Sequence, residues 1–244
     1  MTAIFISDLH LDDRRPEATD AFAHFLDTLP EGTTHLYILG DLFESWVGDD
    51  DYAPLPNRVA DLLSTVRDRG VRIGFMHGNR DFALGEAYAQ RAGMMLLDDP
   101  TRVDLPGGDA LLMHGDTLCT DDLDYQAFRA QVRDPAWLAQ MLSQPLAVRR
   151  AFAAQARAGS QAHTAATAES IMDVNAGAVE RAFREHGTTL LIHGHTHRPA
   201  VHRIELDGQH RTRIVLGDWY EQGTVLHVHR DGRMVLSRLE RDTD

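Results

Sequence analysis

The chain has 244 residues, a single cysteine (Cys119) and a formal net charge of −13 at pH 7. This acidity argues against a general nucleic-acid-binding protein, because phosphate backbones favour basic surfaces, and one cysteine excludes an internal disulfide and fits a reducing cytoplasm. No apolar run approaches the roughly 20 residues that span a bilayer, and the first residues lack the basic and cleavage segments of a signal peptide, so we expect neither.

Strands and helices alternate in the first part of the chain. We expect short β-rich runs at Thr2–Ser7, His35–Leu39 and Val71–Met76, with amphipathic helices at Glu17–Leu29 and Leu55–Arg69 between them. This alternation predicts βαβ units and a parallel sheet.

The pattern changes after Gly93. Further short strands are expected at Met94–Leu97, Thr101–Leu105, Asp109–Met113 and Leu190–His193, followed by meander-like strands at Arg203–Leu206, Arg213–Leu216, Thr224–His229 and Met234–Leu239. Residues 121–186 are mostly helical and contain no convincing strand. We therefore predict an α/β core made of residues 1–120 and 187–244, with a helical insertion at 121–186.

Five short motifs each follow a β-type run and place metal-competent side chains just beyond it. They are Asp8-Leu9-His10, Gly40-Asp41, Gly78-Asn79-Arg80-Asp81, His114-Gly115-Asp116 and Gly194-His195-Thr196-His197. In extended backbone, residues i and i+2 face the same side, so both Asp-x-His and His-x-His can converge on one ion. Alone, Asp-x-His is most often a turn or a satisfied surface pair and Gly-Asp a turn, whereas Gly-His-x-His is about as often a metal site. Five such motifs in succession behind strands form a specific signal.

The candidate ligands are mixed nitrogen and oxygen donors: Asp8, His10, Asp41, Asn79, His114, His195 and His197. Seven such ligands are too many for one zinc site and suit two ions that share a bridging carboxylate. The lack of thiolates argues against a structural zinc, and the histidines argue against an all-oxygen Mg²⁺ or Ca²⁺ site. Mn²⁺, Fe²⁺, Co²⁺ and Zn²⁺ all stay possible on this chemistry.

In this order, the five motifs resemble the signature of the calcineurin-like metallophosphoesterases. The resemblance implies a four-layer α/β/β/α sandwich. It also implies one metal held by Asp8, His10, Asp41 and His197, and a second held by Asp41, Asn79, His114 and His195. Arg80 stands where many family members carry a histidine.

The motifs and the residues around them also resemble a subgroup of this family that acts in lipid A biosynthesis. The stretches that carry this resemblance are Tyr37–Glu44, Trp46–Asp51, His77–Phe82, Met113–Asp122, Ile171–Asn175 and Ile192–Ala200. Members of that subgroup cleave the pyrophosphate bond of a UDP-linked diacylated glucosamine. The resemblance implies that this chain binds two Mn²⁺ ions and attaches peripherally to the cytoplasmic face of a Gram-negative inner membrane. We expect a monomer that does not bind nucleic acid. Attack on the α-phosphorus would come from water activated by the two metals, with Arg80, Asn79 and His195 as catalytic residues.

The insertion has two helical apolar faces around Pro135 and Pro145. Their apolar residues are Tyr125, Phe128, Val132, Trp137, Leu138, Met141, Leu142, Leu146, Val148 and Phe152, and the interspersed basic residues are Arg129, Arg133, Arg149, Arg150 and Arg157. By pattern alone this is ordinary packing of a helical cap with a solvated charged face. The resemblance favours the alternative, which is a groove for acyl chains with basic residues near anionic headgroups.

The resemblance also implies substrate contacts, which map onto Asn79, Arg80, Asp122, Tyr125, Arg157, Ser160, Thr164, Thr167 and His195. Relatives often have Asn and Lys at positions 164 and 167. A chain without lysine cannot supply the second, so headgroup binding there differs and Arg157 is a candidate substitute. Asp122 is also a candidate N-cap residue of a helix. Cys119 is expected to be a small buried residue.

Two rival functions are weighed against this one. The first is a soluble metallophosphoesterase acting on nucleotides or phosphoproteins, against which the apolar insertion argues. The second is a non-catalytic scaffold that retains the fold. Such a scaffold would lose metal ligands, whereas all seven candidates are present here.

Overall fold

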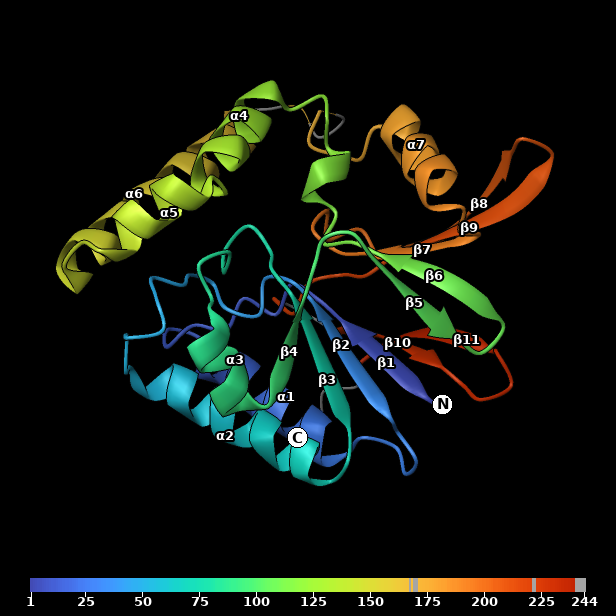
Figure 1. The fold of residues 1–244 in the computed structure, drawn as a ribbon, viewed down its shortest axis with the longest axis horizontal. Coiled ribbons are helices and arrows are strands. Elements are labelled where there is room, and N and C mark those ends of the chain that lie inside the picture. Colours follow the sequence, from blue (N-terminus) through green and yellow to red (C-terminus); the bar gives the residue numbers. More distant parts are fainter. Residues whose placement is uncertain (167, 169–170, 221–222, 240–244) are drawn as a thin grey trace.

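Two β-sheets face each other, and helices cover both outer faces (Figure 1). The computed structural model describes residues 1–244 except 167, 169–170, 221–222 and 240–244, and it leaves the side chains of 164–166 undescribed. The first sheet has the spatial order β11 (Met234–Arg238), β10 (Thr224–Val228), β1 (Ala3–Ile6), β2 (His35–Leu39), β3 (Arg72–Met76) and β4 (Met94–Leu97). The second has the order β5 (Thr101–Leu105), β6 (Gly108–Leu112), β7 (Leu190–His193), β9 (Gln209–Val215) and β8 (Ala200–Leu206).

Strands β1 to β4 are parallel, as the alternation of strands and helices predicted. In the second sheet β6, β7 and β9 are also parallel. The carboxyl ends of parallel strands meet at one edge, where α/β proteins place their ligands. The final strands do not form one meander, because β8 and β9 complete the second sheet whereas β10 and β11 complete the first.

The apolar core has three parts, which define the four layers. Between the sheets, Phe5 and Leu39 of the first pack with Leu112 and Ile192 of the second. The outer face of the first sheet is covered by α1 (Pro16–Asp27), α2 (Pro54–Asp68) and α3 (Glu86–Ala92). The outer face of the second is covered by α7 (Ala176–His186) through residues such as Phe183. The predicted α/β/β/α sandwich is thereby confirmed.

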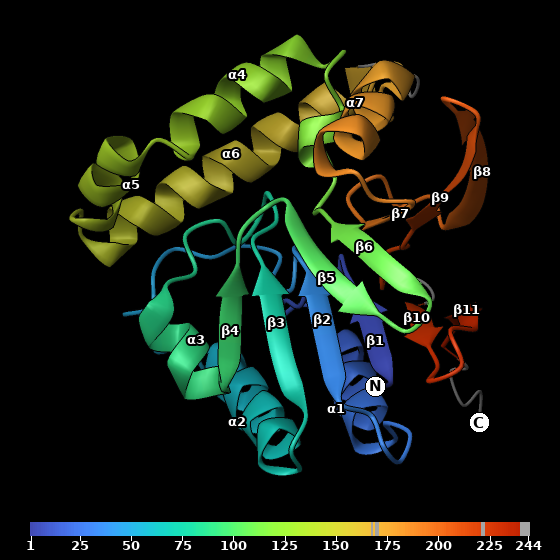
Figure 2. The ribbon, with the colours of Figure 1, turned by 45° about the vertical axis from the view of Figure 1, so that its right-hand side comes forward.

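Three further helices form a separate layer over the carboxyl ends of the strands (Figures 1 and 2). They are α4 (Leu123–Val132), α5 (Pro135–Leu142) and α6 (Leu146–Ala166), and we call them the cap. Asp122 caps α4 by accepting from Tyr125 N at 3.1 Å, and Asp134 caps α5 by accepting from Trp137 N at 2.8 Å. Helix α7 lies in the same predicted insertion but packs on the second sheet. Within the described residues, none of the helices has the length and apolar content needed to cross a bilayer.

Candidate active site

The seven candidate ligands meet at the carboxyl edge of the two sheets. Asp8 and His10 follow β1, Asp41 follows β2, Asn79 follows β3, His114 follows β6, and His195 and His197 follow β7. In one half of the site, the Nε2 atoms of His10 and His197 lie 3.2 Å apart, and His197 Nε2 lies 3.4 Å from Asp8 Oδ1. This half joins side chains from opposite sheets.

In the other half, the amide oxygen Oδ1 of Asn79 lies 3.0 Å from both His114 Nε2 and His195 Nδ1. Asp41 lies between the halves, with Oδ2 3.7 Å from His10 Nε2 and Oδ1 3.9 Å from His114 Nε2. A carboxylate with one oxygen toward each half has the position of a bridging ligand.

The backbone at these residues is not extended. Five candidate ligands have positive φ angles: Asp8 (55°), His10 (49°), Asp41 (52°), His195 (68°) and His197 (56°). We expected Asp8 and His10, and likewise His195 and His197, to converge through extended backbone. That expectation is wrong, although the side chains of each pair do converge. Left-handed residues are costly unless their surroundings hold them, and such strain gathers at functional sites.

The left-handed turns are held by hydrogen bonds between loops. Asp8 N donates to Gly40 O at 3.1 Å, His10 N donates to Asp41 O at 2.9 Å, and His195 N donates to Asp8 Oδ2 at 2.9 Å. Gly78 allows a close approach, because a Cβ there would collide with the Asp41 carboxylate.

Groups behind the candidate ligands orient the histidine rings. His114 Nδ1 lies 2.8 Å from Leu39 O, His10 Nδ1 lies 3.1 Å from Glu44 Oε2, and His197 Nδ1 lies 3.3 Å from Asp218 Oδ2. Each contact leaves Nε2 facing the site, which is the arrangement of metal-binding histidines. Sequence reasoning missed Glu44 and Asp218, because their partners are distant in the chain and no local spacing reveals them.

The electrostatics of the site favour added positive charge. Burial opposes protonation of His114, but carboxylates led by Asp41 outweigh it and raise the pKa of this histidine to about 9. Burial lowers the pKa of His195 to about 4, so this ring is neutral at pH 7 and able to bind a metal. Burial also acts to raise the pKa of Asp8, but hydrogen bonding to His197 holds it well below its ordinary value.

The donor set fits divalent cations. Asp8 Oδ1 is buried and lies 3.4 Å from His197 Nε2. In the part of the chain that the structure describes, two groups of side chains bring their ligand atoms close enough to hold an ion: Asp8–His10–His197 and Asp8–Asp41–His114. Buried acceptors that face one another without a proton to share are stabilised when a cation lies between them.

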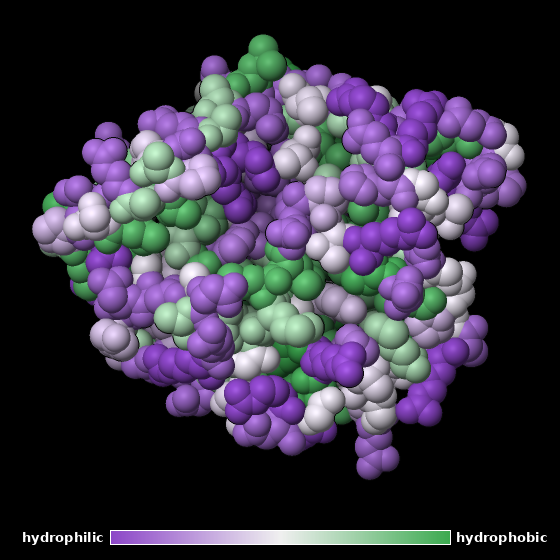
Figure 3. Space-filling view, in the orientation of Figure 1, coloured by the Kyte–Doolittle hydropathy of each residue, from purple (hydrophilic) through white to green (hydrophobic). Residues whose placement is uncertain are grey.

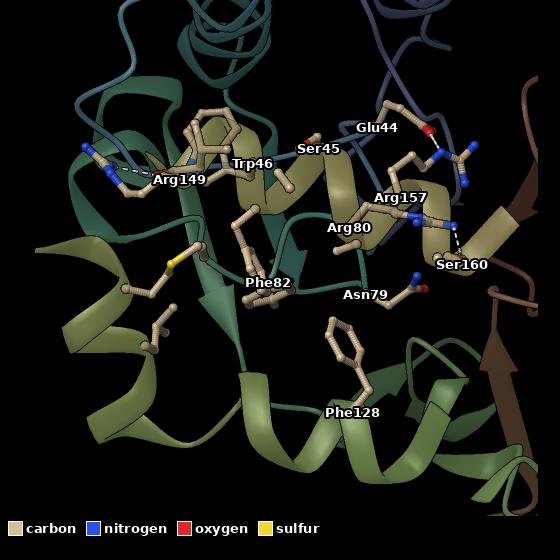
Figure 4. A pocket seen from close by; sticks show the side chains of 18 of the residues that line it. Glu44, Ser45, Trp46, Asn79, Arg80, Phe82, Phe128, Arg149, Arg157 and Ser160 are labelled. Carbon is tan, nitrogen blue, oxygen red and sulfur yellow. Dashed lines mark hydrogen bonds and ion pairs between the residues drawn. The ribbon is translucent and has the colours of Figure 1, made fainter. Parts of the chain in front are cut away.

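A cavity of about 300 Å³ opens beside Asn79 and extends under the cap. Figure 4 shows Asn79, Arg80 and Ser160 at one end of it, and Phe82 and Phe128 farther along. Trp137, Leu138, Met141 and Phe152 continue the apolar wall. In Figure 3, hydrophobic residues gather where the cap meets the body. We call this the cap cavity.

The predicted substrate contacts divide into three sets. Asn79, Arg80, Tyr125, Arg157 and Ser160 line the cap cavity. Asp122 does not line the cavity, but it caps α4, and its Oδ2 atom lies 2.8 Å from His163 Nε2. His195 does not line the cavity either, and its ring lies 5.7 Å from the ring of Tyr125. The side chain of Thr164 and the whole of Thr167 lie outside the described residues.

A family model for calcineurin-like phosphoesterases matches residues 1–199. The chain belongs to this family. Curated relatives named UDP-2,3-diacylglucosamine hydrolase are 57% identical in Xanthomonas axonopodis pv. citri and 56% identical in Xanthomonas oryzae pv. oryzae, each match covering 95% of this chain and 97% of the relative. The relative of that name in Stenotrophomonas maltophilia is 55% identical, with 95% and 96% covered. Membership in the family implies divalent-metal binding.

In this calcineurin-like phosphoesterase, the cap is bonded to the loop that carries His114. Asp116, which is fully buried, accepts from Tyr125 Oη at 2.8 Å and from Arg129 Nε at 2.7 Å. Both donors lie on α4. Tyr125 therefore has a positioning contact in addition to its place on the cavity wall.

The C-cap residue of the same helix, Arg133, reaches the loop that carries Asn79. Arg133 Nη2 donates to Gly78 O at 2.8 Å. Asn79 and His114 belong to the same half of the site, so α4 connects both of their loops. This connection depends on helical spacing, since Arg129 and Arg133 are four residues apart and lie on one face.

We expect Arg129→Met to lower the free energy of unfolding by about 3 kcal/mol, because the buried Asp116 carboxylate would lose its charged partner. Urea denaturation measures this, and the double variant Arg129→Met/Asp116→Asn should recover part of the loss. Arg67→Met is a matched control, because its pair with Asp68 is exposed and should change stability by at most about 0.5 kcal/mol. Equal losses in the two single variants would contradict a structural role for the buried pair.

Proposed function

We propose that this phosphoesterase hydrolyses the pyrophosphate bond of UDP-2,3-diacylglucosamine to UMP and 2,3-diacylglucosamine 1-phosphate, a step of lipid A biosynthesis. The observation that carries this proposal is the cap cavity, which joins an apolar interior to the candidate metal centre. Its apolar walls suit acyl chains, and its polar end suits a phosphorylated sugar. The names of relatives that match nearly the whole chain support the same substrate.

The proposed cofactors are two Mn²⁺ ions. Asp8, His10, Asp41 and His197 would hold one, and Asp41, Asn79, His114 and His195 would hold the other. When bound, the two ions would supply Lewis acidity and activate water for attack on the α-phosphorus. Carboxylate, amide and imidazole donors without thiolate suit Mn²⁺ among the divalent transition metals.

Arg80 is the proposed phosphate-binding residue. Its backbone N donates to Asp41 Oδ1 at 2.8 Å, which places the residue beside the metal centre. Its Nη2 donates to Ser160 Oγ at 3.2 Å, and its buried Nε has no hydrogen-bond partner among the described residues. A half-buried guanidinium with a free donor is suited to the charge that develops on phosphoryl oxygens.

We also propose that the protein is a monomer attached peripherally to the cytoplasmic face of a Gram-negative inner membrane. Leu142 and Val148, near the turn between α5 and α6, are 37% and 48% exposed. They would meet the membrane surface that supplies the lipid. Two arginines of the cap are paired with acidic residues of the body: Arg149 with Asp50 and Arg150 with Asp51.

The direct test is release of UMP from UDP-2,3-diacylglucosamine in detergent micelles. We expect activity with added Mn²⁺, its loss on chelation and its return when Mn²⁺ is restored. Generic phosphoesters should be hydrolysed far more slowly. Faster hydrolysis of soluble nucleotides than of the UDP-lipid would favour the soluble phosphoesterase and overturn the proposal.

The acyl-binding role of the cap cavity makes a separate prediction. Phe128→Ala should raise KM for the diacylated substrate roughly 10- to 100-fold, the range expected when a large apolar contact is lost. A deacylated analogue should show little change. Leu123→Ala is the matched control, because Leu123 lies on the same helix, is 74% exposed and does not line the cavity. An equal effect of the two variants would remove Phe128 from the acyl site.

A further inference from the structure

A second cavity, of about 210 Å³, lies beside the cap cavity. It is lined by Asp12, Arg14, Arg15, Glu44, Arg157 and Tyr220. The two cavities share Glu44 and Arg157, which form an ion pair. Figure 4 shows this pair at the polar end of the cap cavity. The Glu44–Arg157 ion pair thus separates the cap cavity from the second cavity.

The second cavity adjoins the other half of the metal centre. Three of its residues contact His10: Glu44 Oε2 lies 3.1 Å from Nδ1, Arg15 Nη2 donates to the carbonyl oxygen at 2.7 Å, and the Tyr220 ring stacks on the imidazole with centroids 4.9 Å apart. The cap cavity shares Glu44 with the second cavity, and it alone of the two is lined by Asn79 of the opposite half. A pyrophosphate at the centre could therefore extend its two ends into different cavities.

The walls of the second cavity suit a nucleoside and do not suit acyl chains. Arg14 is held by Asp12 through hydrogen bonds of 2.9 Å and 2.7 Å, yet its side chain is 79% exposed, so a face of the guanidinium is open. A planar guanidinium can stack on a base and donate to its carbonyl oxygens. The carboxylate of Asp12 can accept from ribose hydroxyls. Hydrocarbon would remove these charged side chains from water, at a cost in free energy.

We propose that the second cavity binds the uridine of the substrate, with Arg14 contacting the base and Asp12 contacting the ribose. This inference rests on the proposed function, because a UDP-linked lipid carries a nucleoside at one end of its pyrophosphate and acyl chains at the other. The cap cavity accounts for the acyl end. The second cavity accounts for the nucleoside, and it makes Arg14 a residue of substrate specificity.

The test compares the affinities of the two products. Calorimetric titration of the Mn²⁺-loaded protein with UMP should give a Kd that is tenfold or more higher for Arg14→Ala than for wild type, consistent with loss of a charged contact. Titration with 2,3-diacylglucosamine 1-phosphate in detergent should change less than twofold. Arg58→Ala is the control, because Arg58 pairs with Asp20 on the surface and touches neither cavity.

Failure of the proposed uridine subsite and failure of the proposed function give different results. An unchanged UMP affinity in both Arg14→Ala and Arg14→Glu would overturn the subsite, as would equal weakening of both products. A wild-type protein that releases no UMP from the UDP-lipid would overturn the proposed function. A wild-type protein that releases UMP while Arg14→Ala binds it equally well would overturn only the subsite.

Discussion

Replacing Asp41 by Asn should lower kcat/KM for the UDP-lipid roughly 10³- to 10⁴-fold. Asp41 directs one carboxylate oxygen toward each half of the site, at 3.7 Å from His10 Nε2 and 3.9 Å from His114 Nε2. Loss of its charge would weaken both metal sites at once. Lewis-acid stabilisation is worth several kcal/mol, and each 1.36 kcal/mol is about a tenfold change in rate.

Metal binding provides a readout for this variant that does not depend on turnover. Calorimetric titration with Mn²⁺ should show weaker binding at both sites in Asp41→Asn. Asp68→Asn is the control, because Asp68 is exposed and pairs with Arg67 far from the site. Normal turnover, or weakening of one metal site only, would contradict the bridging position of Asp41.

Replacing Arg80 by Ala should lower kcat roughly 10²- to 10³-fold, the loss seen when one donor to a developing oxyanion is removed. The buried Nε of Arg80 without a partner among the described residues is the structural reason. Arg80→Lys should restore only part of the rate, because an ammonium lacks the fork of donors that a guanidinium presents.

Ser160→Ala is the variant with which Arg80→Ala is compared. Its hydroxyl accepts from Arg80 Nη2 at 3.2 Å, so its loss should loosen the guanidinium without removing it. We expect a reduction of roughly tenfold or less. A fall in kcat for Arg80→Ala no larger than that for Ser160→Ala would remove Arg80 from charge stabilisation.

Much of the fold follows from local pattern. The predicted strand His35–Leu39 has the bounds of β2, and the helices predicted at 17–29 and 55–69 lie within one or two residues of α1 and α2. Helix α3 was not predicted. It has only seven residues between Gly85 and Gly93, which is too short for a periodic apolar pattern to stand out.

The pairing of the last four strands could not be read from local pattern. Meander spacing is the same whether a hairpin joins one sheet or the other. The division arises because β9 pairs with β7 in the second sheet, whereas β10 pairs with β1 in the first. Such pairing depends on contacts between residues distant in sequence.

The sequence by itself determined which side chains gather at the candidate site. Ligand type and order, and the position of each motif just after a strand, sufficed because the carboxyl ends of parallel strands meet at one edge. Only the tertiary structure decided how the ligands converge, through left-handed turns at residues such as Asp8 and His195 rather than through extended backbone. The turns are held by hydrogen bonds between loops, and no residue encodes such a bond alone.

The tertiary structure also decided what surrounds the metal centre. Glu44 orients His10, α4 bonds the loops of Asn79 and His114, and the pair Glu44–Arg157 divides two cavities. Each of these contacts joins segments that are separate in the chain. Side-chain identity sets which partners are chemically possible, and the packing of the cap on the sheets selects which of them meet.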